Sequence, residues 1–196
     1  MKNKRMILGI AGYIASGKSE AGRYFAHLGA KFIEADQVVN ELYRPGGDGY
    51  RKIVSFFGRE YLRKNGEINR KKLAKFVFSD GRKLKILNSL IHPLVCEQVR
   101  KIIGKSREKM VVIEAAYFEK KRLLEPVDRI IWIECGKRIL KRRAIKNNRI
   151  TGEMFERIIG SQSKPEKIDY KVDNGSNLAA LHGQLKKIYV DLCGER

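Results

Sequence analysis

The segment from Gly12 to Ser19 places the strongest constraint on this chain, and it reads Gly-Tyr-Ile-Ala-Ser-Gly-Lys-Ser. Its spacing fits G-x-x-x-x-G-K-[ST], a phosphate-binding loop in which backbone N–H groups surround phosphate oxygens. In such a loop Lys18 reaches the β- and γ-phosphates of a nucleoside triphosphate, and the Ser19 hydroxyl holds Mg²⁺. The apolar run 6–11 predicts a buried strand before the loop, and residues 19–28 predict a helix after it. Strand, loop and helix in this order predict a phosphate-binding site.

Four more apolar runs predict strands, at 31–35, 110–114, 129–134 and about 168–172. Because continuous runs such as Val-Val-Ile at 111–113 suit strands buried on both faces, we expect a parallel sheet. Strands that alternate with helices predict a three-layer α/β fold around this five-stranded parallel sheet. We expect the whole chain, 1–196, to form a single domain of this kind.

Residues 37–108 interrupt the alternation, and we expect them to form a helical insertion that supplies one wall of a substrate cleft. Helices are predicted at 38–43, over about 50–57 with Gly58 as the stop, from Asn69 to 78, and after Ser79 or Asp80. Asn69 and either Ser79 or Asp80 are the predicted N-caps. The last helix is expected to be interrupted at His92-Pro93, because a residue before proline disfavours the helical conformation.

Residues 137–161 are predicted to form a lid of two helices, with Thr151 as the cap of the second. Six basic residues crowd the first of these helices: Lys137, Arg138, Lys141, Arg142, Arg143 and Lys146. A lid of this kind closes over ATP, excludes water and supplies arginines to the transferred phosphoryl group. A C-terminal helix is then predicted from an apolar stripe of Leu178, Leu181, Leu185, Ile188 and Leu192.

The charge balance restricts the partners of the chain. Its 196 residues include 42 Lys and Arg against 22 Asp and Glu, a net charge of +20. Such a surface suits either nucleic acid or a phosphorylated small substrate. We favour the small substrate, since the basic residues are spread along the sequence and no zinc-finger, RRM or basic-zipper pattern occurs. No apolar run is long enough to span a membrane. Three widely spaced cysteines suggest a reducing cytoplasm. The sequence does not indicate an oligomeric state.

A phosphate-binding loop alone does not distinguish GTPases, ATPases and small-molecule kinases. The guanine-reading tetrapeptide N-K-x-D is absent from the sequence, and the chain is short for a motor ATPase. The helical insertion and the basic lid favour a small-molecule kinase that uses ATP and Mg²⁺. The predicted ATP site in the loop consists of Gly12, Ala15, Ser16, Gly17, Lys18 and Ser19, with Ser19 also on the metal.

Several short motifs occur in a specific order along the chain. They are the loop at 10–19, Glu34-Ala35-Asp36, Pro45-Gly46, Leu90-Ile-His-Pro-Leu94, Phe118-Glu119, Val127-Asp128-Arg129, Ser161-Gln162, Asp169-Tyr170 and Val172-Asp173-Asn174. In this order and spacing the chain resembles the dephospho-coenzyme A kinase family, from the first strand to about residue 190. The resemblance implies ATP-dependent phosphorylation of the ribose 3′-hydroxyl of dephospho-CoA, the last step of coenzyme A biosynthesis.

The chain departs from the family pattern at several positions. Ala15 stands where the family has glycine, so a positive φ there costs on the order of 1 kcal/mol. Glu34 replaces an aspartate, and Ala115-Ala116-Tyr117 replaces Pro-Leu-Leu in one wall of the cleft. In the lid, Arg143 matches the first arginine of the family pattern, and Asn147 stands where the pattern has its second arginine.

The candidate catalytic residues besides Lys18 each have a structural alternative. Asp36 follows the second strand, at the edge where open α/β sheets bind ligands, and the resemblance implies that it is the general base. Otherwise it is a helix cap. Arg143, with Arg142 as the fallback, is expected to contact the phosphates, and the alternative is a solvated basic helix face.

Three further residues are candidates for binding. His92 either hydrogen-bonds substrate or has a structural role in a turn. Glu119 either contacts substrate or metal, or forms a surface salt bridge. Asn174 follows the fifth strand, where related kinases hold adenine, and the alternative is a turn-forming asparagine.

Two other functions remain open for the chain as a whole. A nucleoside or nucleotide kinase of the same fold differs from the implied enzyme only in its acceptor. A basic nucleic-acid-binding protein with a phosphate-binding loop would also account for the net charge of +20.

Overall fold

The computed structural model describes residues 5–115, 127–148 and 150–194. Contacts divide the chain into two compact units. The sheet unit comprises Met1–Glu34 and Ser106–Arg196, and the helical unit comprises Ala35–Lys105.

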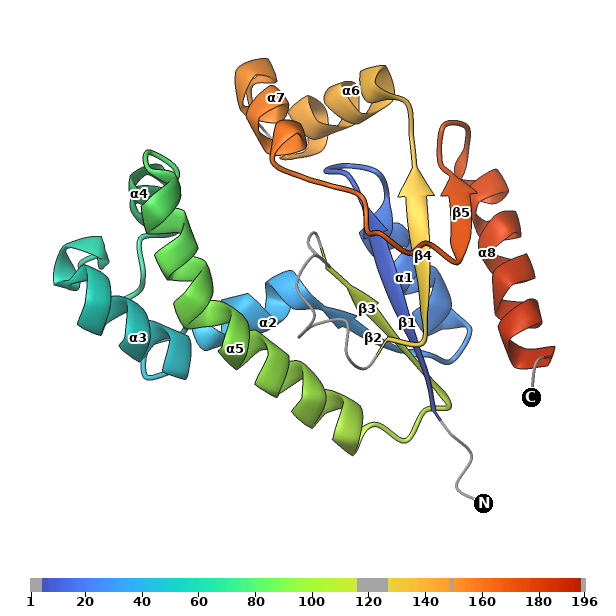
Figure 1. Cartoon of the computed structure of the whole chain (residues 1–196), viewed down its shortest axis with the longest axis horizontal. Coiled ribbons are helices and arrows are strands. Elements are labelled where there is room, and N and C mark those ends of the chain that lie inside the picture. The colour runs from blue at the N-terminus through green and yellow to red at the C-terminus, as the bar shows by residue number, and fades with distance from the viewer. Residues whose placement is uncertain (1–4, 116–126, 149, 195–196) are drawn as a thin grey trace. The chain divides into compact units, whose positions relative to one another are not determined.

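The sheet unit contains five parallel strands in the order β2-β3-β1-β4-β5 (Figure 1). They are β1 (Met6–Gly12), β2 (Lys31–Glu34), β3 (Met110–Glu114), β4 (Arg129–Glu134) and β5 (Tyr170–Asp173). All five predicted strands are therefore confirmed, each within two residues at its ends. β1 lies between β3 and β4, so the loop that follows it begins where the strand order reverses, which is where open α/β sheets bind their ligands.

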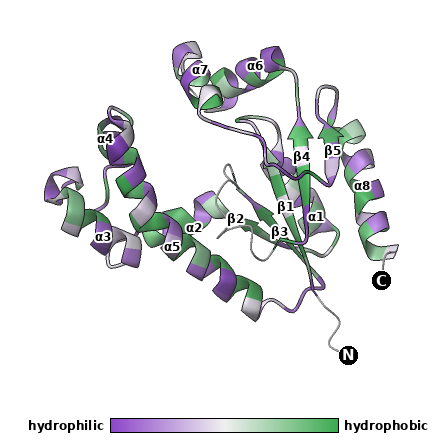
Figure 2. Cartoon of the chain, in the orientation of Figure 1, coloured by the Kyte–Doolittle hydropathy of each residue, from purple (hydrophilic) through white to green (hydrophobic). Residues whose placement is uncertain are grey.

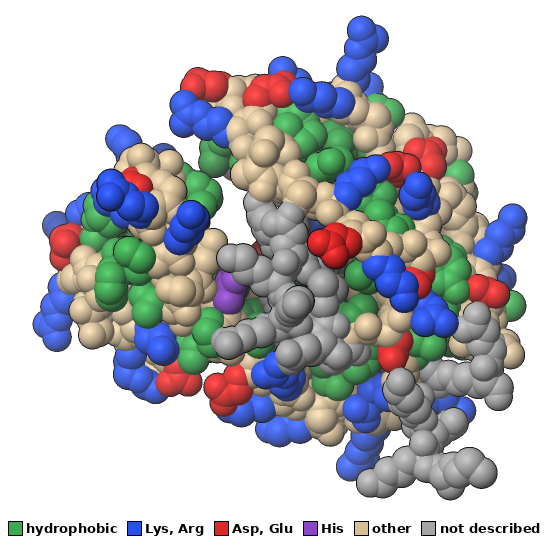
Figure 3. Space-filling model, viewed as in Figure 1, with side chains coloured by type: hydrophobic (Ala, Val, Ile, Leu, Met, Phe, Trp, Pro, Cys, Tyr) green, Lys and Arg blue, Asp and Glu red, His purple; other side chains and the backbone are tan. Residues whose placement is uncertain are grey.

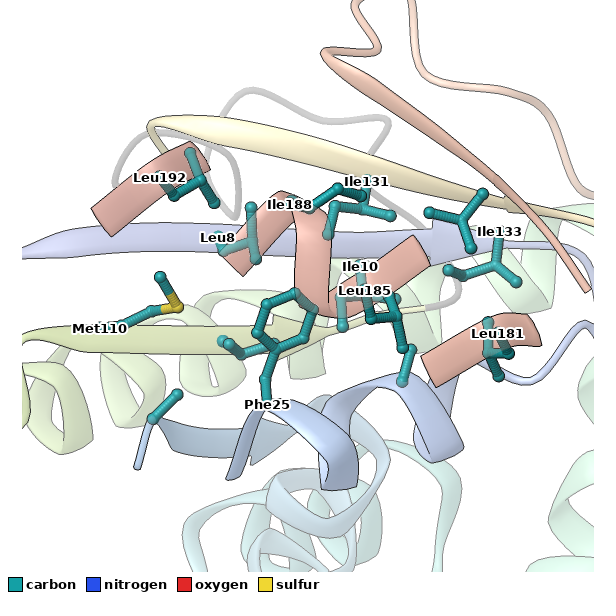
Figure 4. Packing of buried hydrophobic residues seen from close by; sticks show 14 residues of the cluster. Leu8, Ile10, Phe25, Met110, Ile131, Ile133, Leu181, Leu185, Ile188 and Leu192 are labelled. Atoms are coloured by element: carbon teal, nitrogen blue, oxygen red, sulfur yellow. The ribbon is translucent and has the colours of Figure 1, made fainter. Parts of the chain in front are cut away.

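One face of this sheet packs against α1 (Lys18–His27) and α8 (Leu178–Gly194) (Figure 4). Leu8 and Ile10 of β1 lie in a core with Phe25 of α1 and Leu185 of α8. The predicted stripe on α8 is buried at Leu181, Leu185, Ile188 and Leu192. The prediction is wrong for Leu178, which is 53% exposed because it begins the helix, ahead of the residues that face the core.

The helical unit consists of α2 (Ala35–Leu42), α3 (Asp48–Phe57), the 3₁₀ turn η1 (Arg59–Tyr61), α4 (Arg70–Val77) and α5 (Gly81–Lys105). Helix α5 packs against α2, α3 and α4. The predicted caps act as expected, since the Asn69 side chain accepts from the Lys72 N–H at 3.1 Å and Asp80 accepts from the Arg82 N–H at 2.8 Å. Gly58, with φ of 94°, ends α3 as predicted.

Two predictions for the helical unit are wrong. Helix α2 begins at Ala35, directly after β2, so Asp36 lies in its first turn and is not a cap before it. Helix α5 continues through His92 and Pro93 without interruption. An internal proline costs a helix roughly 3 kcal/mol. Burial of Ile91 and of Val95, on either side of the proline, offsets that cost through packing.

The lid helices predicted from the basic segment are α6 (Lys137–Asn148) and α7 (Gly152–Gly160). The Thr151 hydroxyl accepts from the Met154 N–H at 3.2 Å and caps α7 as predicted. Lys137 and Lys141 of α6 both pair with Glu156 of α7, at 2.8 and 3.0 Å. Figure 2 shows the contrast between α6, which is largely hydrophilic, and the hydrophobic strands β1 and β4. None of the described helices is long and apolar enough to cross a membrane.

Candidate active site

The two glycines of the phosphate-binding motif are required by the space around them. A Cβ atom at Gly12 would lie 2.5 Å from the Ser16 Oγ and 2.8 Å from the Ile133 carbonyl oxygen. Gly17 has φ of 100°, and a Cβ atom there would overlap the Asn174 carboxamide. Both positions allow the backbone to curl tightly between β1 and α1.

Ala15 adopts the left-handed conformation, with φ of 59°, and it is the only non-glycine residue with positive φ in the described part of the chain. The dephospho-coenzyme A kinase pattern has glycine at this position, and the backbone of this chain adopts the conformation there that glycine favours. The Ala15 side chain also packs against an apolar cluster of Leu140, Ala144 and Phe155 in the lid helices.

Lys18 and Ser19 begin α1 and face partners within the sheet unit. The Lys18 side chain is only 8% exposed, and its Nζ donates to the Tyr13 carbonyl oxygen at 3.0 Å. The Ser19 hydroxyl donates to Glu114 Oε1 at 3.0 Å. Lys18 therefore lies folded over the loop, and Ser19 is directed at a carboxylate on the neighbouring strand β3.

Glu114 is a candidate site residue that the sequence did not single out. It ends β3, which pairs directly with β1, and its side chain meets Ser19 at the carboxyl edge of the sheet. In P-loop enzymes a serine of the loop and an acid from a nearby strand together hold Mg²⁺. The sequence feature that could have identified Glu114 is its place as an acidic residue at the end of a buried apolar strand, at the edge of the sheet where ligands bind.

The hydrogen bonding of Ser16 indicates whether the loop suits a phosphate. Its hydroxyl is 1% exposed, and within the described residues it has no hydrogen-bond partner. A buried hydroxyl without a partner costs about 1–3 kcal/mol, a cost that a phosphate oxygen at the loop would remove. The described residues contain no group of three or more His, Cys, Asp or Glu able to hold a metal by themselves. Ser19 and Glu114 nevertheless fit Mg²⁺, which commonly takes one or two protein ligands together with phosphate oxygens.

Two carboxamides from the C-terminal part of the chain reach the loop. The buried Asn174 side chain, 7% exposed, donates from Nδ2 to the Ser16 carbonyl oxygen at 2.7 Å. Gln162, just beyond α7, accepts from the Ile14 N–H through Oε1 at 2.9 Å. Asn174 thus contacts the loop backbone, and its predicted contact with adenine stays a prediction. Gln162 appeared in the sequence only as part of a motif, without a role.

Arg143, the predicted lid arginine, is half-buried on α6. Its Nη1 lies 3.8 Å from the Cys135 Sγ, just after β4. Burial raises the pKa of the Cys135 thiol, and the charge of Arg143 opposes part of that rise. The fallback residue Arg142 is exposed on the same helix. The contact of either arginine with phosphate stays a prediction.

The predicted acceptor-site residues lie outside the sheet unit or outside the described residues. Asp36 is exposed in the first turn of α2, where a carboxylate interacts favourably with the helix dipole. His92 is half-buried in the middle of α5, so its alternative role in a turn is wrong. Glu119 lies outside the described residues.

On the face that Figure 3 shows, the basic side chains are not gathered at one place. Figure 3 shows Lys and Arg side chains over the viewed face, on the sheet unit as well as on the helical unit. Several Lys and Arg side chains of the protein are paired with carboxylates, as in the contact of Lys164 with Glu134 at 2.5 Å. This distribution agrees with the spread of basic residues along the sequence.

Comparisons with known proteins point to one family. A family model described as dephospho-CoA kinase matches residues 6–179. The dephospho-CoA kinase of Aquifex aeolicus (strain VF5) is 33% identical over 190 residues, which cover 94% of this chain and 96% of that protein. The dephospho-CoA kinase of Hahella chejuensis is 31% identical over 192 residues, covering 96% of this chain and 92% of that protein.

A solved structure of dephospho-CoA kinase from Campylobacter jejuni superposes with a TM-score of 0.68 at 25% identity, over 100% of both chains. The fold is therefore the three-layer α/β fold of P-loop kinases that the sequence predicted. Since the family model spans the chain from β1 to the start of α8, and relatives over 30% identical align along nearly its full length, the chain belongs to the dephospho-CoA kinase family.

Proposed function

We propose that this protein transfers the γ-phosphoryl group of ATP to the ribose 3′-hydroxyl of dephospho-CoA, giving CoA and ADP. The observation that carries the proposal is the loop in a chain of this family. Its buried Ser16 hydroxyl has no hydrogen-bond partner among the described residues, and its Ser19 hydroxyl contacts Glu114. Phosphoryl transfer needs positioning and charge neutralisation more than covalent chemistry by the protein.

The loop binds the triphosphate in this proposal. Lys18 leaves the Tyr13 carbonyl oxygen, which it contacts at 3.0 Å, and neutralises the β- and γ-phosphates. Gly12, Ala15, Ser16 and Gly17 supply the tight backbone that surrounds the phosphate oxygens.

Ser19 and Glu114 are the residues that would hold Mg²⁺. The metal supplies positive charge at the β- and γ-phosphate oxygens when bound. The hydroxyl–carboxylate contact at 3.0 Å supports this pairing because both side chains offer oxygen ligands, which Mg²⁺ prefers.

Asp36 is the general base of the proposed reaction. Its carboxylate takes the proton of the 3′-hydroxyl while the ribose oxygen forms a bond to the γ-phosphorus and the bond to the β–γ bridging oxygen breaks. ADP leaves with that oxygen.

Arg143, or Arg142 in its place, neutralises the charge of the transferred phosphoryl group from the lid. His92 and Glu119 contact the acceptor, and Asn174 also borders adenine. We further propose that the reaction takes place in the cytoplasm, where cysteines outside disulfides persist as thiols.

A coupled assay for ADP release tests the proposal with ATP, Mg²⁺ and dephospho-CoA. We expect turnover that depends on dephospho-CoA and on Mg²⁺. A panel of nucleosides and nucleotides serves as the control for the acceptor. Absence of ADP release above background with dephospho-CoA would refute the proposal, and faster turnover with a nucleoside or nucleotide would reassign the acceptor.

The net charge of +20 requires its own control. We propose that nucleic acid is not a partner, since the basic residues are dispersed and partly paired. Binding to single- and double-stranded nucleic acid at increasing salt tests this point. Tight binding that persists at moderate salt would contradict it.

A further inference from the structure

We propose that Gln162 and Asn174 are positioning residues, which hold two peptide groups of the phosphate-binding loop in the orientation that ATP requires. The inference rests on the proposed function because it assigns these residues to the ATP site. The Gln162 carboxamide accepts a hydrogen bond from the loop backbone, and the Asn174 carboxamide donates one to it.

The first peptide group joins Tyr13 to Ile14 and is held at both of its ends. Its N–H donates to Gln162 Oε1 at 2.9 Å, and its carbonyl oxygen accepts from Lys18 Nζ at 3.0 Å. Because a trans peptide is planar, with N–H and C=O pointing in opposite directions, fixing the N–H on Gln162 directs the carbonyl toward Lys18. Gln162 therefore sets the position from which Lys18 moves to the phosphates.

The second peptide group joins Ser16 to Gly17. Its carbonyl oxygen accepts from Asn174 Nδ2 at 2.7 Å, so its N–H points away from Asn174. The Asn174 backbone N–H is itself bound to the Glu134 carbonyl oxygen at 2.8 Å, which anchors the residue to β4. Without this donor, the Ser16 carbonyl would be buried without its side-chain partner and the peptide could rotate, which would withdraw the Gly17 N–H from the phosphate side.

The two residues connect the loop to different parts of the sheet unit. Gln162 follows α7, and its own N–H donates to the Ile159 carbonyl oxygen at 3.3 Å, so it is fixed to the end of the lid. Tyr13, Ile14 and Ala15 also pack against the apolar cluster of the lid helices. Asn174 follows β5. The loop is thus held by the lid on one side and by the sheet on the other.

The two contacts respond differently to the same chemical change from amide to acid. Glutamate at 162 keeps an acceptor oxygen for the Ile14 N–H, whereas leucine removes it. Aspartate at 174 removes the donor and places a carboxylate against the Ser16 carbonyl oxygen. A general packing role would not distinguish an acceptor from a donor.

Asn177 supplies the matched control for the added charge. It lies three residues after Asn174, and its Oδ1 accepts from the Ala180 N–H at 2.9 Å as the cap of α8. Asn177→Asp adds the same negative charge in the same segment while keeping a good cap. The structure gives Asn177 no hydrogen bond to the loop among the described residues.

The test is direct titration with a fluorescent ATP analogue, together with KM for ATP and KM for dephospho-CoA. We expect Gln162→Leu and Asn174→Asp each to weaken ATP binding about tenfold, through the loss of one hydrogen bond to the loop. Gln162→Glu is expected to bind ATP more tightly than Gln162→Leu, and Asn177→Asp to stay close to the wild type. KM for dephospho-CoA is expected to be unchanged in all four variants.

Nucleotide affinities within twofold of the wild type for both Gln162→Leu and Asn174→Asp would overturn the inference. Equal losses for Gln162→Leu and Gln162→Glu would also overturn it for Gln162. Circular dichroism checks folding, and if Asn174→Asp does not fold, the comparison of the two Gln162 variants decides. The titration needs no acceptor, so a protein that binds ATP with these differences but does not phosphorylate dephospho-CoA would refute only the proposed activity.

Discussion

Ala15 offers the sharpest test of the loop geometry, because its φ of 59° lies in a region that favours glycine. Alanine in place of glycine at a positive φ lowers the free energy of unfolding by on the order of 1 kcal/mol. This figure is a net value, which already includes the greater conformational entropy of glycine in the unfolded chain. The Ala15 methyl group is half-buried against Leu140, Ala144 and Phe155, and its loss costs about 0.4 kcal/mol at roughly 0.8 kcal/mol per buried carbon. We therefore expect Ala15→Gly to stabilise the protein by about 0.6 kcal/mol.

The matched control is Ala26→Gly on the exposed side of α1. Glycine costs at most about 0.8 kcal/mol relative to alanine at Ala26, which lies in the last turn of α1. The two variants are therefore expected to differ by up to about 1.4 kcal/mol and in opposite directions. Urea unfolding measures both. Trp132, the only tryptophan, is 1% exposed in β4 with its ring 5.1 Å from that of Tyr13, so its fluorescence reports on the sheet unit. Equal destabilisation by the two substitutions would refute the assigned strain at Ala15.

Lys18→Ala is expected to abolish turnover and leave the urea midpoint nearly unchanged, and substantial residual turnover would contradict its role on the phosphates. Asp36→Asn should lower kcat at least about 100-fold while ATP binding is spared, because only proton removal is affected; near-normal kcat would exclude Asp36 as the base. Glu114→Gln should raise the Mg²⁺ concentration needed for half-maximal activity, and an unchanged Mg²⁺ dependence would exclude it from the metal site. The hydrogen bond from Lys164 lowers the pKa of Glu134, so this pair stabilises the folded state fully above the ordinary glutamate pKa. The effect declines below that pH and is lost as pH falls through the lowered pKa of the folded state. Lys164→Met is therefore expected to cost under about 1 kcal/mol at pH 7 and less at pH 3, measured by urea unfolding, and equal losses at both pH values would contradict the electrostatic origin.

Local signals accounted for most of the secondary structure. The caps at Asn69 and Thr151 depend on a side chain and an N–H group three residues later, so the sequence alone predicts them. The apolar runs likewise predict the strands because burial on both faces leaves no polar alternation. Where local preference competes with packing, the prediction was wrong, as at Pro93 inside α5.

The sequence by itself predicted a phosphate-binding loop, which lies between β1 and α1, and showed a resemblance to one kinase family. The tertiary structure alone decided which distant residues complete the loop. Glu114 reaches Ser19 across 95 residues of sequence, Gln162 reaches Ile14 across 148, and Asn174 reaches Ser16 across 158. These contacts depend on the strand order that places β3 and β4 beside β1. Periodicity and capping act only between neighbours along the chain, so they carry no information about that order.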